Sequence, residues 1–260
     1  MLAKQVFSSL VAVGLCASIG NAAMVLRYEF EAAPGNIVAD ISGSGTAKDL
    51  TLNNGASIVT DVERGNVLSL DGVNDYGSTA ACTAGDKLDT QNSITMMGWI
   101  NTTTTSRDTI ASRSFGPGPF MELNTTGYAN KATAHVGGPG LETYSTTSVN
   151  DESWHHLAMT YDASTLRIFV DGFEETSAPG SGRTDASQTL PFLVGALGQP
   201  TISRYFGGLI DDLRVYNTVL DENEIQAAMA AEPNVVPEPG SALLWFGILA
   251  FTFFIRRRRA

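Results

Sequence analysis

Aromatic side chains on predicted loops and strands are the residues of this chain best suited to contact a ligand. Tyr128, Tyr144 and Tyr205 lie close to turn-forming residues, and His135 lies on a central β-rich run. An aromatic ring with a polar edge can stack on the face of a sugar ring and hydrogen-bond beside it. We therefore predict these four residues as candidate ligand-binding residues. The alternative is that each ring simply anchors a turn.

The elements that must position these side chains are short strands. Glycine, asparagine and proline turns separate β-rich runs that recur about every ten residues, and these runs occupy residues 25–30, 66–70, 94–100, 131–136, 154–161, 166–170, 192–195 and 208–216. Asp171-Gly172 is the strongest hairpin signal, because this pair tolerates the positive φ of a type I′ turn. Trp99 and Trp154 lie on two of these runs, and we expect both in the core.

One helix is predicted in the body of the chain. Asp221 is its expected N-cap, and Glu224, three residues later, completes a capping box before an apolar run. Many short strands and a single helix predict an all-β fold built as a two-sheet antiparallel sandwich. The composition indicates one such domain over residues 24–230, followed by a proline-containing linker over 231–240.

Six segments in the right order resemble the laminin G-like, concanavalin A-like jelly-roll family. They are Asp40-Ile41-Ser42-Gly43, Leu68-Ser69-Leu70-Asp71-Gly72, Thr95-Met96-Met97-Gly98-Trp99-Ile100, Trp154-His155-His156-Leu157-Ala158, Val170-Asp171-Gly172 and Gly208-Leu209-Ile210-Asp211-Asp212-Leu213. The resemblance implies a jelly-roll sandwich with a groove that carries ligand contacts.

The same resemblance implies a structural calcium ion. Loop oxygen atoms suit this hard cation, and the candidates are Asp40 and Ser42 in the opening loop and Asp212 in the closing strand. These segments are expected to meet, because the first and last strands of such sandwiches are commonly neighbours. The alternative is a loop cap and an unrelated surface carboxylate.

The sequence does not favour catalysis. Glycoside hydrolysis needs paired carboxylates at a defined separation, and the chain lacks the closely spaced acidic string of the jelly-roll glycosidases. Its main acidic cluster, around Asp221, is explained by helix capping. Nucleophile-elbow, zinc-protease and phosphate-loop motifs are also missing from the sequence. We predict no catalytic residue and no enzyme activity.

Both ends of the chain read as targeting segments. Residues 1–23 have the charge, apolar run and small residues of a secretory signal peptide. Near the other end, Pro237, Glu238 and Pro239 precede an apolar run and four arginines at 256–259, which predicts a hydrophobic helix and arginine tail over 241–260. This tail resembles the PEP-CTERM sorting signal of exopolysaccharide-producing bacteria. The predicted helix over 241–255 is about 22 Å long, shorter than a roughly 30 Å membrane core, which favours a transient hold. The alternative is a buried helix.

The charge of the body limits its partners. The net charge is −11 for the whole chain, and without Lys4 and the four terminal arginines 11 basic residues remain against 27 acidic ones, a net charge of −16. Such a domain repels nucleic acid. Together, these features predict an exported, non-catalytic protein that binds glycan or protein. The tail implies processing by an exosortase-type membrane protease at the inner membrane, then a place at the cell surface or in an exopolysaccharide matrix. The alternatives are a matrix protein without a specific ligand and a glycan-degrading enzyme.

Overall fold

The computed structural model describes residues 23–32, 35–83, 85–90, 93–113, 118–137, 141–181, 189–198 and 201–231. The predicted signal peptide, apart from Ala23, lies outside these residues. So do the Pro237-Glu238-Pro239 segment and the predicted C-terminal helix. Within the described part of the chain, no helix is long and apolar enough to cross a membrane.

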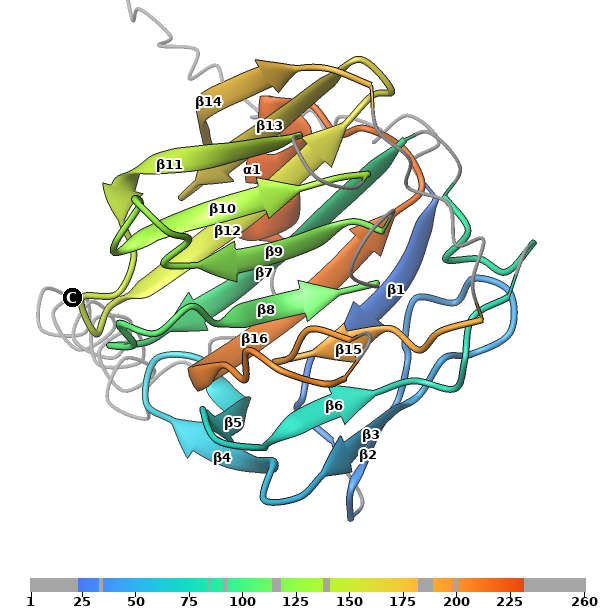
Figure 1. Cartoon of the computed structure of the whole chain (residues 1–260). Helices are drawn as coiled ribbons and strands as arrows, with labels where there is room; N and C mark the ends of the chain where they lie inside the picture. Colours follow the sequence, from blue (N-terminus) through green and yellow to red (C-terminus); the bar gives the residue numbers. More distant parts are fainter. Residues whose placement is uncertain are drawn as a thin grey trace, which may run out of the picture.

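Two antiparallel sheets form a sandwich, which confirms the predicted all-β jelly-roll fold (Figure 1). In the first sheet the strands lie in the order β14 (Phe173–Pro179), β13 (Thr165–Val170), β12 (Trp154–Tyr161), β7 (Ile94–Asn101), β16 (Gly207–Tyr216), β5 (Gly65–Asp71) and β4 (Ser57–Asp61), and β1 (Met24–Tyr28) also pairs with β16. In the second sheet the order is β11 (Glu142–Ser148), β10 (Lys131–His135), β9 (Phe120–Leu123), β8 (Thr109–Ser112), β15 (Leu193–Val194), β6 (Tyr76–Ser78), β3 (Leu50–Asn53) and β2 (Ile37–Val38).

The last strand, β16, organises the first sheet. One edge pairs with β7, while the other pairs first with β5 and then with β1. The first and last strands are therefore neighbours, as the sequence predicted. The main core fills the space between the sheets and includes Leu26, Met96, Met121, Ile168 and Phe192.

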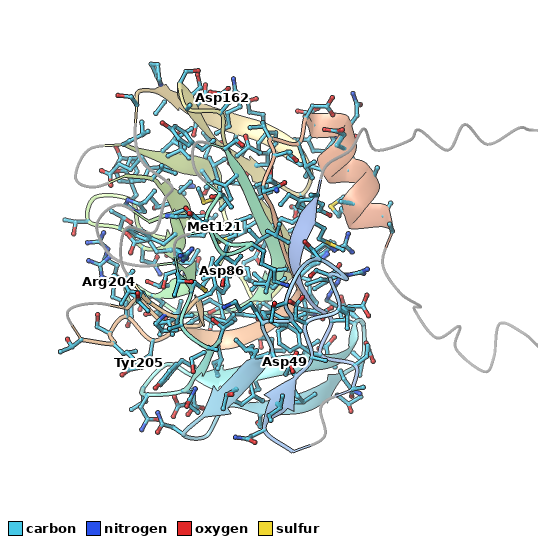
Figure 2. The ribbon with its side chains drawn as sticks, turned by 90° about the vertical axis from the view of Figure 1, so that its right-hand side faces the viewer. Asp49, Asp86, Met121, Asp162, Arg204 and Tyr205 are labelled. Atoms are coloured by element: carbon cyan, nitrogen blue, oxygen red, sulfur yellow. The ribbon has the colours of Figure 1, made fainter. Side chains whose placement is uncertain are left out.

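The single described helix, α1 (Glu222–Ala230), covers the outer face of the first sheet. Its Ile225 and Ala228 pack in a second apolar cluster with Met97 and Phe169, and Figure 2 shows the helix on the side of the sandwich opposite Arg204. Its N-terminus is the predicted capping box of Asp221 and Glu224. The predicted Asp171-Gly172 turn is also confirmed, since both residues have positive φ, 51° and 84°.

The prediction that Trp99 and Trp154 belong to the core is wrong. Both rings lie half-buried outside the core clusters, beneath the guanidinium of Arg64, whose carbon atom is 4.2 Å from the centroid of Trp99 and 5.3 Å from that of Trp154. Arg64 also binds the carboxylate of Asp211 at 2.8 Å. The pairing of Trp99 with Asp211 across β7 and β16 places the ring on the outer face of the sheet. The Arg64 guanidinium above the two rings therefore provides cation–π contacts in place of the core packing that the sequence predicted.

Candidate functional site

A buried carboxylate organises the outer face of the second sheet. On β9, Met121 and Leu123 belong to the core, so the strand alternation turns Glu122 to the other face. The Glu122 side chain is fully buried (0 % exposed), although it does not point into the core between the sheets. A charged group in this environment must be paired to remain ionised.

Four side chains hydrogen-bond to Glu122. Its Oε1 accepts from Arg107 Nε at 3.0 Å, from Thr125 Oγ1 at 2.8 Å and from His135 Nε2 at 2.8 Å, with the imidazole as the donor. Its Oε2 accepts from Arg204 Nη1 at 2.6 Å. Burial alone would raise the pKa of Glu122, but the hydrogen bonds from His135 and Arg107 outweigh it and hold the pKa at about 2. Glu122 is therefore a fixed anion that holds four segments together.

His135 connects this buried group to the surface. Its ring stacks on Phe120 with centroids 4.2 Å apart and an interplanar angle of 10°. Its Nδ1 lies 3.3 Å from Glu142 Oε2. Phe120, His135 and Glu142 are cross-strand partners on β9, β10 and β11, so sheet pairing alone brings them into one row. The Glu142 side chain is 37 % exposed and forms the solvent end of that row.

Two tyrosines form a stacked platform beside the row. The rings of Tyr128 and Tyr144 are nearly parallel, with centroids 3.4 Å apart and an angle of 6°. Tyr144 is held from β11, where its hydroxyl donates to Glu142. Burial and this hydrogen bond to a carboxylate raise the pKa of the Tyr144 phenol, so it stays protonated. Tyr128 remains 41 % exposed and forms the outer layer of the platform.

Loop hydrogen bonds position Tyr128. Tyr128 lies in the loop between β9 and β10, where its backbone amide donates a hydrogen bond to Thr125 O at 2.7 Å. Asn124 and Asn130 both have positive φ, 55° and 64°, a conformation that asparagine tolerates well. The Asn124 side chain accepts from the Asn130 amide at 2.6 Å and donates to Ser106 O at 2.8 Å. These contacts tie the tyrosine loop to the neighbouring loop between β7 and β8.

Three of the four predicted ligand residues therefore meet on one face. Tyr128, His135 and Tyr144 lie together around Glu142, whereas Tyr205 packs on Tyr76 with centroids 6.2 Å apart. The residue before it, Arg204, forms an ion pair with Glu122. Figure 2 labels Arg204 and Tyr205. Sequence reasoning missed Glu122, although a carboxylate between two apolar strand residues was an available signal.

The residues predicted to bind calcium do not fit that ion. The ammonium group of Lys87 forms an ion pair with Asp40 and donates to Ser42 Oγ at 3.3 Å and to Ser44 O at 2.9 Å. The lysine thus occupies the oxygen cluster of the opening loop, and it lowers the pKa of Asp40 against the effect of burial.

Asp212, the third predicted calcium ligand, is engaged elsewhere. It pairs with Arg214 and lies 3.4 Å from Arg27 Nε. Across the described ranges, no group of three or more His, Cys, Asp or Glu residues is placed to hold a metal ion. The opening loop and the closing strand do approach each other through Arg27, whose amide lies 3.4 Å from Asp40 Oδ1. Cationic side chains therefore balance the carboxylates of this region.

Comparison with solved structures supports the fold assignment. Domain 4 of AbnA, an extracellular arabinanase from Geobacillus stearothermophilus solved with arabinotriose, is similar with a TM-score of 0.61 and 16 % identity, over 80 % of this chain and 98 % of that one. The binding domain of Paraclostridial Mosquitocidal Protein 1 has a TM-score of 0.61 and 12 % identity, over 78 % and 51 %. The binding domain of botulinum neurotoxin DC, solved with SialylT, has a TM-score of 0.60 and 11 % identity, over 80 % and 51 %.

The chain thus spans about half the length of the two toxin domains and nearly all of the arabinanase domain. No curated protein sequence matches it. A family model described as the concanavalin A-like lectin/glucanases superfamily matches residues 74–226, more than half of the chain. This range holds Glu122, the tyrosine platform and both arginines that pair with Glu122. The chain belongs to the concanavalin A-like lectin/glucanase superfamily.

Proposed function

We propose that this chain is a non-catalytic glycan-binding protein, and that its ligand stacks on the Tyr128–Tyr144 platform. The observation that carries the proposal is the exposed Tyr128 ring beside the charged row of His135 and Glu142. A pyranose ring would cover the free face of Tyr128. Its hydroxyl groups would donate to the Glu142 carboxylate and accept from Arg107, whose side chain is 35 % exposed.

The buried part of the site supports such a role by holding the surface residues still. Glu122 fixes His135 and Arg107, and His135 in turn contacts Glu142. A binding face that is rigid before the ligand arrives loses less conformational entropy on binding. The relatives agree in chemistry, because one was solved with an arabinose trisaccharide and another with SialylT.

The same residues fit glycoside hydrolysis less well than glycan binding. A glycosidase needs two carboxylates that reach the scissile bond from solvent. Glu122 is fully buried, is ionised and already accepts four hydrogen-bonding side chains, so it suits positioning better than proton transfer. We therefore assign Glu122 the role of a positioning residue.

The proposal places the protein outside the cell. The predicted signal peptide over residues 1–23 and the Pro237-Glu238-Pro239 tail support export, a transient hold in the inner membrane and processing by an exosortase-type protease. The mature protein would then act at the cell surface or in an exopolysaccharide matrix. Intact mass of the protein from native membranes and medium tests this part: a product that ends within 237–240 supports sorting, and an intact arginine tail on membranes contradicts it.

Glycan-array binding of the full chain tests the ligand site. Tyr128→Ala should reduce binding at least tenfold, because it removes the exposed layer of the platform. Tyr205→Ala is the matched control, since this tyrosine packs on Tyr76 and should leave binding unchanged. Wild-type protein that binds no glycan, or equal losses in the two variants, would contradict the proposal and favour a matrix protein without a specific ligand.

A further inference from the structure

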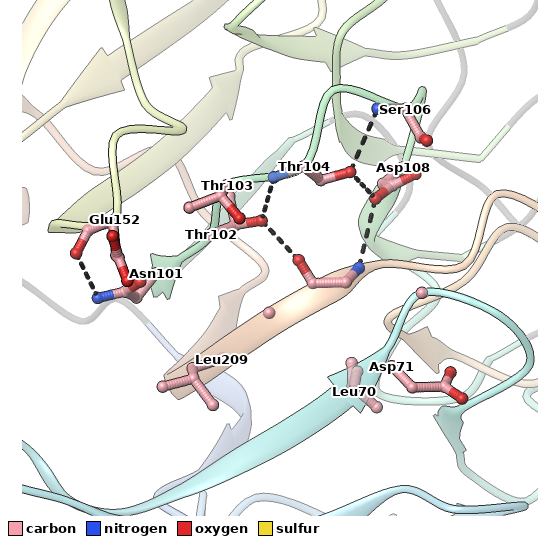
Figure 3. Close-up of a pocket in the computed structure, with 13 residues that line it drawn as sticks. Leu70, Asp71, Asn101, Thr102, Thr103, Thr104, Ser106, Asp108, Glu152 and Leu209 are labelled. Atoms are coloured by element: carbon pink, nitrogen blue, oxygen red, sulfur yellow. Dashed lines mark hydrogen bonds between the residues drawn. The ribbon is translucent and has the colours of Figure 1, made fainter.

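A cleft lies beside the loop between β7 and β8, away from the tyrosine platform, and Figure 3 shows the residues that line it. Its volume is about 460 Å³, within the range typical of small-molecule sites. It is lined by the ends of β5 and β7, the start of β16 and the loop that carries Thr103, Ser106 and Asp108. None of the predicted ligand residues lines it.

Glycine backbone forms the floor of this cleft. Gly208 has φ +146°, and a Cβ atom there would lie 2.5 Å from the carbonyl oxygen of Asn101. Gly72 faces Gly207 so closely that a Cβ on Gly72 would lie 3.1 Å from the Gly207 Cα. Side chains are thus excluded from these positions, and the strand ends meet through bare backbone. The cleft stays open above them.

A chain of hydrogen bonds fixes the walls. Thr102 Oγ1 donates to Gly207 O at 2.5 Å, and Thr104 Oγ1 donates to Asp108 Oδ2 at 2.7 Å. The Gly207 amide also donates to Asp108 Oδ2, at 3.3 Å. Figure 3 shows these bonds linking the loop to β16 across the cleft. The shape of the cleft is therefore set before any ligand enters.

The polar groups that remain exposed accept hydrogen bonds or carry hydroxyls. Thr103, Ser106, Asp71 and Glu152 are all exposed at the rim. Among the residues that the structure describes, no lysine, arginine or histidine lines the cleft. Burial raises the pKa of Asp108, which lies behind the hydroxyl of Thr104. This electrostatic environment repels anions, and its carboxylates and hydroxyls can accept hydrogen bonds from the hydroxyl groups of an uncharged ligand.

The opposite side of the same loop differs in charge. Arg107 points to Glu122, where Arg204 also lies, so the tyrosine face carries guanidinium groups that the cleft lacks. Asn124 and Asn150 both donate to Thr104 O, at 3.1 and 2.9 Å, and hold the loop between the two surfaces. One loop thus separates two surfaces that differ in their charged groups.

We infer that the cleft is a second saccharide site, which takes an uncharged sugar unit through its hydroxyl groups. The inference rests on the proposed glycan-binding function for the class of ligand, but it uses none of the residues that carry that proposal. Hydroxyl donors would pair with the carboxylates of Asp71 and Glu152, and the hydroxyls of Thr103 and Ser106 would complete the contacts. A glycan with several units could engage both surfaces of the loop.

Amide chemical-shift mapping of the full chain tests this site, with uncharged methyl glycosides of common hexoses and pentoses as probes. We expect saturable shifts at Thr103, Ser106 and Gly208, and much weaker shifts with methyl glucuronide, which is anionic. Ser106→Trp should abolish the cleft shifts by filling the space. Ser177→Trp, at an exposed serine on the distant strand β14, is the matched control and should leave them intact.

The outcomes separate the two sites. Shifts restricted to Tyr128, Tyr144 and their neighbours would overturn the second site and leave the proposed function standing. Shifts restricted to the cleft would support the second site and count against the tyrosine platform. Cleft shifts that persist in Ser106→Trp, or that are equally strong with glucuronide, would overturn the inference. Absence of shifts at both surfaces would overturn the inference and the proposed function together.

Discussion

His135 Nε2 lies 2.8 Å from Glu122 Oε1, on adjacent strands of the second sheet. Through the His135 ring, the buried carboxylate is linked to the partly exposed Glu142 on the next strand. All three side chains lie on the face of the sheet that points away from the core. Arg107 and Arg204 bind the same carboxylate, so Glu122 is the centre of this hydrogen-bond network.

Replacement of Glu122 should be among the most damaging single changes on this face. Glu122→Gln leaves two arginines without their buried partner, and breaking a buried ion pair typically costs about 3–5 kcal/mol. Glu142→Gln is the matched control, because that carboxylate is partly exposed and should cost about 1 kcal/mol or less. Urea unfolding of both variants measures the difference, and equal losses would show that Glu122 is not the centre of the network.

The same carboxylate predicts acid sensitivity. Its pKa is about 2 in the folded protein, against 4.5 for an unperturbed glutamate. A carboxyl group with a lowered folded pKa stabilises the fold fully above its unfolded pKa. We expect the free energy of unfolding to fall as the pH drops from about 4.5 towards 2. Urea unfolding across this range should show a shallower loss in Glu122→Gln, and parallel curves for the two proteins would refute the assignment.

Lys87 should make the opening loop independent of calcium. Lys87→Gln leaves the fully buried Asp40 carboxylate without its cation, which should cost about 3 kcal/mol or more. Lys131→Gln is the control, because the Lys131 amine makes exposed contacts with Thr146 and Ser148. Thermal melting of the wild type should not change with calcium or with a chelator. A rise in the wild-type melting temperature with calcium would restore the predicted metal site.

The capping box should account for much of the local stability of α1. Asp221→Ala removes the acceptor for the Glu224 amide and should cost about 1 kcal/mol. Asp221→Asn keeps a good N-cap and should cost a few tenths of a kcal/mol. Hydrogen exchange of the helix amides should be faster in the alanine variant alone. Equal exchange in both variants would mean that packing of Ile225 on the sheet holds the helix without its cap.

Local signals in the sequence predicted much of the fold. The Asp171-Gly172 turn and the Asp221–Glu224 cap depend on residues within three positions of each other, so the chemistry that decides them is visible in the chain itself. The strand alternation around Glu122 is local in the same sense. The two tryptophans were misplaced because alternation shows that a strand has two faces without showing which face meets the other sheet.

By itself, the sequence determined the class of fold, the turns, the helix cap and three of the residues on the tyrosine face. Only the tertiary structure decided which of them meet. Arg107, Glu122, His135 and Arg204 come from four segments, and Lys87 reaches Asp40 across 47 positions. Strand pairing and loop approach bring these charges together, and neither is a property of any short stretch of chain. The physical reason is that these partners lie far apart in the sequence, so only long-range packing sets the distance between them and removes the water that would screen their charges.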